Sequence, residues 1–152
     1  KWRRTHFGKA LAKHRASYAL FYEELEKTWA RAKEGLTATD SERADLYLAG
    51  THAVQESAEV VRHLESIAAT TVTMRSHPLE RIHRDIETLR HHGFVNESRY
   101  ASVAQIYWGA ELDYPPLLRW ISSIRLFSSC CDLFFTIFVF KTGMLPRIFW
   151  WN

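Results

Sequence analysis

Cysteine is almost absent from this 152-residue chain, which contains only Cys130 and Cys131. Two adjacent cysteines form neither a disulfide framework nor a pair of metal ligands at zinc-site spacing. The first 116 residues contain no cysteine at all, as suits a protein of a reducing compartment. We therefore expect a cytoplasmic protein.

An excess of one charge is also missing from most of the chain. Residues 1–116 hold 16 Lys and Arg against 16 Asp and Glu, whereas residues 117–152 hold 4 against 1 and supply the net charge of +3. A nucleic-acid-binding domain carries a basic stripe that neutralises phosphates. The neutral body of this chain has no such excess, so no nucleic-acid partner is expected.

The chain lacks a long apolar run. Its longest apolar stretch, Leu133–Phe140, is interrupted by Thr136 and falls well short of the roughly 20 residues that span a bilayer. Asp132 precedes it directly, and a charge is costly at the centre of a membrane. Residues 1–13 are charged throughout and lack the apolar core of a secretory signal. We do not expect a membrane protein.

What the chain does contain is helical periodicity. Apolar side chains recur at steps of three, four or seven in segments that predict helices over residues 7–34, 39–70, 78–93 and 96–109. Four amphipathic helices with short connections predict an all-α fold, an antiparallel four-helix bundle. The stripe expected on the first helix is Phe7, Leu11, Tyr18, Tyr22, Leu25, Trp29 and Ala32, and that on the second is Ala44, Leu48, Val54, Ala58, Val61, Leu64 and Ala68.

The ends of these helices have recognisable signals. Gly35 suits the left-handed position that follows a helix, Gly93 is expected to close the third helix, and Thr39 with Glu42 has the spacing of a capping box. Pro78 is an acceptable first-turn residue, and Asn96 can cap the last helix.

Composition changes after Tyr114-Pro115-Pro116. Residues 117–152 hold 6 of the 9 Phe and none of the 8 His, and they show no clean period of two or 3.6. We therefore divide the chain into a helical bundle, residues 1–114, and an irregular apolar tail without assigned role, residues 115–152. Because the chain starts without Met close to a helical pattern, we expect a fragment whose upstream part is missing.

The first candidate motif stands at the head of the first helix. Residues 4–11 read Arg-Thr-His-Phe-Gly-Lys-Ala-Leu, which resembles the segment that opens the C-terminal helical domain of the acyl-CoA dehydrogenase superfamily. The resemblance implies that Arg4 contacts flavin phosphate oxygens, with Phe7 and Gly8 beside it, often across a subunit interface. A guanidinium suits this task because it is always charged and can grip phosphate bidentately.

The second motif covers residues 76–86, Ser-His-Pro-Leu-Glu-Arg-Ile-His-Arg-Asp-Ile, followed by His91-His92-Gly93. With Ala68-Ala69-Thr70, it resembles the A-G-x…S-P-L-x-R-x-x-R-D…H pattern of the second type of this domain. That type occurs in flavin-dependent monooxygenases of the hydroxyphenylacetate and dibenzothiophene type. The resemblance covers residues 3 to about 112 and assigns Arg84 to the cofactor side. Alanine replaces the glycine of the pattern at Ala69.

One position divides the family by function. Many classical dehydrogenases keep a Glu after Arg-Asp to abstract the substrate α-proton, and Gly93 stands there in this chain. A glycine cannot act as a base. In the monooxygenase-like branch a His precedes that position, which is His92 here. The resemblance implies that His92 is catalytic and binds or deprotonates the substrate, a task that suits imidazole because its pKa lies near neutrality.

The resemblance therefore implies a flavin-dependent oxidoreductase, monooxygenase-like, with FAD or FMN as cofactor and a small-molecule substrate. Its partners would be further copies of the chain, as a tetramer, and a separate flavin reductase; the isolated chain would be inactive. Two alternatives stay open: acyl-CoA dehydrogenation, and a non-enzymatic helical interaction module with a membrane-associating tail. Glu80 and His83 have di-iron spacing but no second motif to complete such a site, so no metal is expected.

Overall fold

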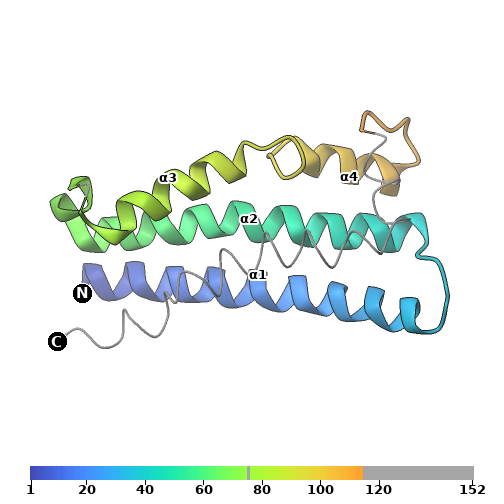
Figure 1. Cartoon of the computed structure of the whole chain (residues 1–152), viewed down its shortest axis with the longest axis horizontal. Helices are drawn as coiled ribbons and strands as arrows, with labels where there is room; N and C mark the ends of the chain where they lie inside the picture. Colours follow the sequence, from blue (N-terminus) through green and yellow to red (C-terminus); the bar gives the residue numbers. More distant parts are fainter. Residues whose placement is uncertain (75, 115–152) are drawn as a thin grey trace.

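The computed structural model describes residues 1–74 and 76–114, and the predicted tail lies outside them. These described residues form helices and no strand (Figure 1). The predicted all-α class and antiparallel bundle are thereby confirmed. The elements are α1 (Trp2–Lys33), α2 (Asp40–Ala68), the short 3-10 helix η1 (Ala69–Thr73), α3 (Pro78–Arg90) and α4 (Arg99–Trp108).

The turn between α1 and α2 follows its local sequence signals. Gly35 adopts the left-handed conformation with φ +72° directly after α1, a backbone that suits glycine. At the start of α2, the Glu42 carboxylate accepts the Thr39 N–H at 2.7 Å, while Thr39 Oγ1 accepts the Glu42 N–H at 3.3 Å. The predicted capping box is present, and α2 returns antiparallel to α1 (Figure 1).

Helix α2 occupies the centre of the molecule. Figure 1 shows α1 along one side of α2, with α3 and α4 end to end along the other. Among the described residues, three small clusters form the core: Phe21 with Ala49 and Ala53, Tyr47 and Ala44 with Val103, and Val61 and Ala58 with Ile86. The single stripe predicted for α2 is therefore too narrow, because a helix with neighbours on two sides also buries Leu46, Tyr47, Ala49, Thr51 and Ala53.

The stripe predicted for α1 is partly wrong. Its buried residues are Ala10, Ser17 and Phe21, whereas Tyr18 and Trp29 are exposed by 41% and 56%. Because α1 packs mainly against α2, only a narrow line of its surface is covered. The aromatic residues beside that line stay on the surface.

Two signals for the connection between α3 and α4 are also wrong. Helix α3 ends at Arg90, and the φ of Gly93 is not positive. Asn96 does not cap α4; its side-chain oxygen accepts the Ser98 N–H at 3.1 Å within the connection. Residues 91–98, which we call the His92 loop, therefore form a separate turn structure. None of the helices in the described part of the chain is long and apolar enough to cross a membrane.

Candidate functional site

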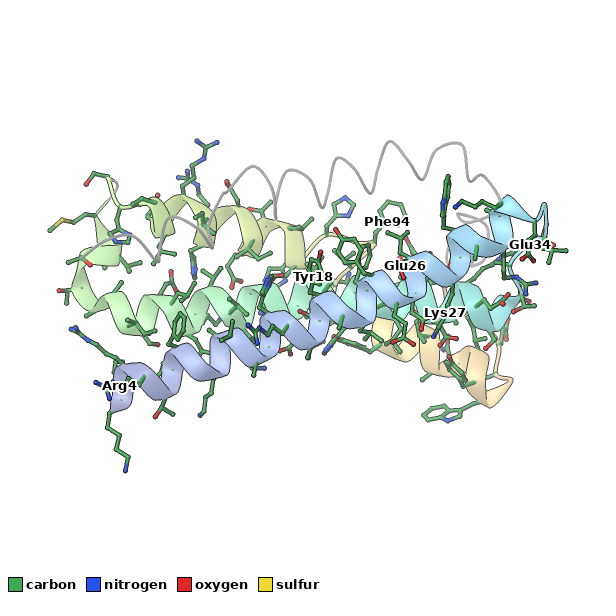
Figure 2. All side chains as sticks on the ribbon, turned by 90° about the horizontal axis from the view of Figure 1, so that it is seen from below. Arg4, Tyr18, Glu26, Lys27, Glu34 and Phe94 are labelled. Carbon is green, nitrogen blue, oxygen red and sulfur yellow. The ribbon has the colours of Figure 1, made fainter. Side chains whose placement is uncertain are left out.

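The first two turns of α1 carry Arg4, Phe7 and Gly8. Arg4 and Gly8 are exposed and Phe7 is half-buried, and Figure 2 shows Arg4 at the free end of the helix. The first turn of α1 contains no acidic residue, and in the described residues no carboxylate pairs with Arg4. Together with the positive end of the helix dipole, these turns form an electropositive surface that fits a phosphate.

Gly8 is not required by the packing of the described residues. A Cβ atom built on Gly8 meets nothing within 4 Å, and glycine inside a helix costs about 0.5–1 kcal/mol relative to alanine. A glycine at this place therefore fits close approach by something outside the described residues, such as a cofactor or a second subunit.

A pair of imidazoles joins the start of α1 to α2. The Nδ1 atoms of His6 and His63 lie 3.1 Å apart, so one ring donates its N–H to the other. Burial, then His6 and the charges of Lys13 and Lys9, lower the pKa of His63, while Glu59 acts in the opposite direction. The pair holds the Arg4 end of α1 against the last third of α2.

Arg84 lies on the outer face of α3. Its side chain is 65% exposed, and its Nη1 atom lies 3.6 Å from the Glu80 carboxylate. Asp85 pairs with Arg81 at 3.6 Å in the same helix. In the described residues, Arg84 and Asp85 therefore each pair with a side chain one turn away in α3, where i and i+4 side chains are neighbours.

His92 lies in the His92 loop just after α3. Its ring stacks on that of Phe94, with centroids 5.4 Å apart and an interplanar angle of 26°. The Phe94 N–H donates to His92 Nδ1 at 3.4 Å. The neighbouring His91 turns instead toward Glu87, with 3.8 Å between Nε2 and the carboxylate. Adjacent histidines thus face different partners.

Two side chains of α2 fasten the backbone of the His92 loop. The Gln55 side-chain amide donates to the carbonyl oxygens of Arg90 at 3.1 Å and Val95 at 2.8 Å. The Tyr47 hydroxyl donates to the Phe94 carbonyl at 2.5 Å. Burial is the main cause that raises the pKa of Tyr47, so the phenol keeps its proton and remains a donor. Sequence reasoning missed both residues, because a side-chain bond to a distant backbone leaves no local pattern.

An aromatic group continues from this loop toward Tyr114. The Tyr114 ring lies 6.3 Å from Phe94 and 6.4 Å from Tyr47 between centroids. The guanidinium carbon of Arg99 stands 3.8 Å from the centre of the Tyr114 ring, within cation–π range. Through Tyr114, these contacts link Phe94 of the His92 loop to Arg99, the first residue of α4.

The predicted site residues fall into separate regions. Arg4, Phe7 and Gly8 share one end of α1, whereas Phe94 of the His92 loop lies well along the bundle from Arg4 (Figure 2). Gln55, which holds the loop, and His63, which holds the α1 end, are eight residues apart on α2, or about 12 Å at 1.5 Å per residue. Arg84 joins neither region through any contact within the described residues.

A family model for the acyl-CoA dehydrogenase C-terminal domain matches residues 4–97 of the chain. The chain belongs to this family. The match begins at Arg4 and includes the His92 loop up to Glu97, so both regions lie within this acyl-CoA dehydrogenase C-terminal domain.

Two curated relatives of the domain are both named indole-3-acetate monooxygenase. The protein from Acinetobacter baumannii is 26% identical and that from Pseudomonas putida 28% identical, each over 103 residues. Each alignment covers 68% of this chain and 26% of the relative. The chain therefore spans about a quarter of the length of these curated relatives. No solved structure matches the chain.

Glu80 and His83, which have di-iron spacing in the sequence, each pair with a different residue in this acyl-CoA dehydrogenase C-terminal domain. Glu80 pairs with Arg84, while His83 Nδ1 lies 2.8 Å from the Glu65 carboxylate of α2. Across residues 1–74 and 76–114, no three His, Cys, Asp or Glu side chains are grouped so that they could hold a metal ion. His83 instead helps to join α3 to α2.

Proposed function

We propose that the chain is the helical domain of a flavin-dependent oxidoreductase with monooxygenase-type chemistry. The observation that carries the proposal is the pair His92-Gly93 in a member of this family: glycine stands where a dehydrogenase needs its carboxylate base, and an exposed imidazole precedes it. The names of both relatives, indole-3-acetate monooxygenase, support the same branch.

Arg4, Phe7 and Gly8 would hold the cofactor, FAD or FMN, with Arg84 as a further contact. Three observations support this assignment: within residues 1–74 and 76–114 no carboxylate pairs with Arg4, the first turn of α1 has no acidic residue, and no described atom would contact a Cβ at Gly8. A bound flavin supplies the redox chemistry, and the protein supplies charge for its phosphate.

His92 would bind the substrate as a hydrogen-bond donor. Because the Phe94 N–H donates to Nδ1, the neutral ring carries its proton on Nε2. An Nε2–H group can donate to an oxygen atom of a substrate and fix its orientation. The names of the relatives make a small aromatic acid the first substrate to test.

The rest of the assembly belongs to the same proposal. Exposed aromatic side chains on α1, Tyr18 and Trp29 among them, support contact with further copies of the chain, as a homotetramer in the cytoplasm. A separate flavin reductase would supply reduced flavin. The isolated chain is expected to bind FMN or FAD weakly and to show no turnover, since a half-built pocket buries little of a ligand.

The test is made in an intact flavoenzyme that carries this domain. His92→Ala should lower turnover about 10²- to 10⁴-fold, the range for a positioned catalytic side chain, with flavin content unchanged. His91→Ala is the matched control and should have little effect. His92→Gln keeps an N–H donor without a titratable group, so partial recovery would support a donor role. Equal turnover in the His92→Ala and His91→Ala enzymes would refute the assignment.

A further inference from the structure

We propose that Gln55 is a positioning residue that sets the orientation of the His92 ring. An effect of Gln55 on catalysis rests on the proposed function of His92. Whether Gln55 orients the His92 ring can be measured separately, without an activity assay. Gln55 lies in the middle of α2 and is half-buried. It is neither in the family motifs nor among the residues expected to touch flavin.

The geometry of the amide explains why one residue can do this. Gln55 Nε2 donates to the carbonyl of Arg90, the last residue of α3, and to that of Val95. These two acceptors flank His92 on both sides along the chain. A single planar amide therefore fixes the distance between the two ends of the segment that carries the ring.

Other backbone bonds of the segment are short-range. The His92 N–H donates to the Leu89 carbonyl, and the His92 carbonyl accepts the N–H groups of Val95 and Asn96 at 3.0 and 2.9 Å. These bonds shape the turn, whereas Gln55 connects it to α2, with Tyr47 as a second connection through the Phe94 carbonyl.

The consequence for the ring is direct. His92 stacks on Phe94, and the Phe94 N–H donates to its Nδ1, so both contacts depend on the path of the backbone from His92 to Phe94. If Val95 is released, that path can relax and the stacking changes. A residue that only stabilised the fold would lower stability without a specific change at the His92 ring.

The experiment uses the full 152-residue chain and two Gln55 variants. Gln55→Met has similar length and no donor. Gln55→Glu presents oxygens to two carbonyl oxygens when ionised but regains one donor when protonated. The matched control is Gln105→Glu, since the Gln105 oxygen accepts the Asp113 N–H at 3.0 Å and a carboxylate keeps that bond.

Two measurements follow in each variant: amide hydrogen exchange of residues 91–98, and the NMR shift of the His92 ring protons, which senses the stacked Phe94 ring. In Gln55→Met, loop exchange should rise about tenfold, as expected for the net loss of a hydrogen bond, and the ring shift should move toward that of an unstacked histidine. Amides of the α1–α2 hairpin should keep their rates. In Gln55→Glu, both changes should appear at neutral pH and partly reverse on acidification, and Gln105→Glu should show neither.

Unchanged His92 ring shifts in both Gln55 variants would overturn the proposal, and so would exchange that rises equally throughout the chain. Its catalytic meaning is tested separately in the intact flavoenzyme, by combining Gln55→Met with His92→Ala. If Gln55 acts through His92, its effect on turnover should vanish in the double variant. The two proposals can fail separately. If the His92 ring shifts move in the Gln55 variants but His92→Ala leaves turnover unchanged, Gln55 still positions the ring and the proposed function of His92 is wrong.

Discussion

The Arg4 end of α1 and the His92 loop hold their candidate residues in opposite ways. Arg4 extends from the free end of a continuous helix and has no carboxylate partner in the described residues (Figure 2). The His92 loop is an irregular segment, and α2 fastens three of the carbonyl groups in and beside it. A charge acts over a distance on a long side chain, whereas a hydrogen-bonding imidazole depends on orientation. A side chain that must be oriented therefore needs hydrogen bonds from the fold to hold its backbone, whereas a charged side chain does not.

Among the variants that follow, the largest effect is expected from the loss of Arg4, which tests the Arg4 end of α1. In the intact flavoenzyme, Arg4→Ala should weaken flavin binding about 10- to 100-fold, the equivalent of a charged hydrogen bond of about 1.5–3 kcal/mol. Turnover at saturating flavin should change little. Titration of the apoprotein with flavin measures the affinity. The neighbouring Arg3→Ala is the control, and an equal loss from both variants would show that general charge rather than Arg4 is responsible.

The tether of the loop is tested by Tyr47→Phe. The ring keeps its packing against Ala44 and Val103, but the Phe94 carbonyl loses its donor. Leaving a buried acceptor unsatisfied costs about 1–3 kcal/mol, so the urea midpoint of the chain should fall accordingly. Tyr107→Phe removes a hydroxyl that donates to Asp45 on the exposed surface. This variant should lower the urea midpoint by less than Tyr47→Phe does. A Tyr47→Phe protein as stable as wild type would mean that the loop does not depend on this bond.

A third prediction concerns the junction after α2, at the end of the bundle where α1 begins. Ala69 has φ 56° and ψ −137°, a conformation that strains any residue with a Cβ by about 1–3 kcal/mol. Ala69→Gly should therefore raise the free energy of unfolding by about 1 kcal/mol after the entropy cost of glycine. Ala68→Gly, at a helical φ of −75°, should lower it. Thermal melts of the two variants would decide, and a loss of stability in both would contradict the strain.

The smallest effect is expected from the His6–His63 pair, and it depends on pH. The pKa of His63 is lowered from its ordinary value of 6.5, so the unfolded chain binds this proton more readily than the folded one. Stability should therefore fall as pH drops below about 6.5. In His63→Gln this part of the pH dependence should disappear in urea titrations between pH 7.5 and 5. An identical slope in both proteins would assign the acid sensitivity to other groups.

The sequence predicted those parts of the fold that depend on near neighbours. Gly35, the Thr39–Glu42 capping box and the start of α3 at Pro78 are all confirmed, since each depends on the conformation of a few successive residues. The apolar periodicity that predicted a helix over residues 78–93 is confirmed as well, with Ile86 buried and Ile82 and Leu89 packed beside it. The glycine that the family pattern carries at position 69 has a physical reason here, because the backbone at Ala69 has a positive φ.

What the sequence did not predict depends on tertiary neighbours. The narrow burial of α1 and the wide burial of α2 follow from their places in the bundle, which periodicity does not report. Gln55 illustrates the same limit at the candidate site: it stands beside the predicted stripe residue Val54, yet its partners are carbonyls 35 and 40 residues away. The regions that carry Arg4 and His92 could be named from motifs, but the way each is held could not.

Because α2 lies at the centre of the described helices, its position should affect how fast its sequence diverges among related proteins. Its small residues Ala44, Ala49, Ala53 and Ala58 are 0–3% exposed and face different neighbours, so a larger side chain at any of them would push apart two packed helices. Along α1 and α3, by contrast, one face contacts no other helix within the described residues. We expect substitutions to accumulate slowest along α2, although the recognisable motifs of the family lie elsewhere.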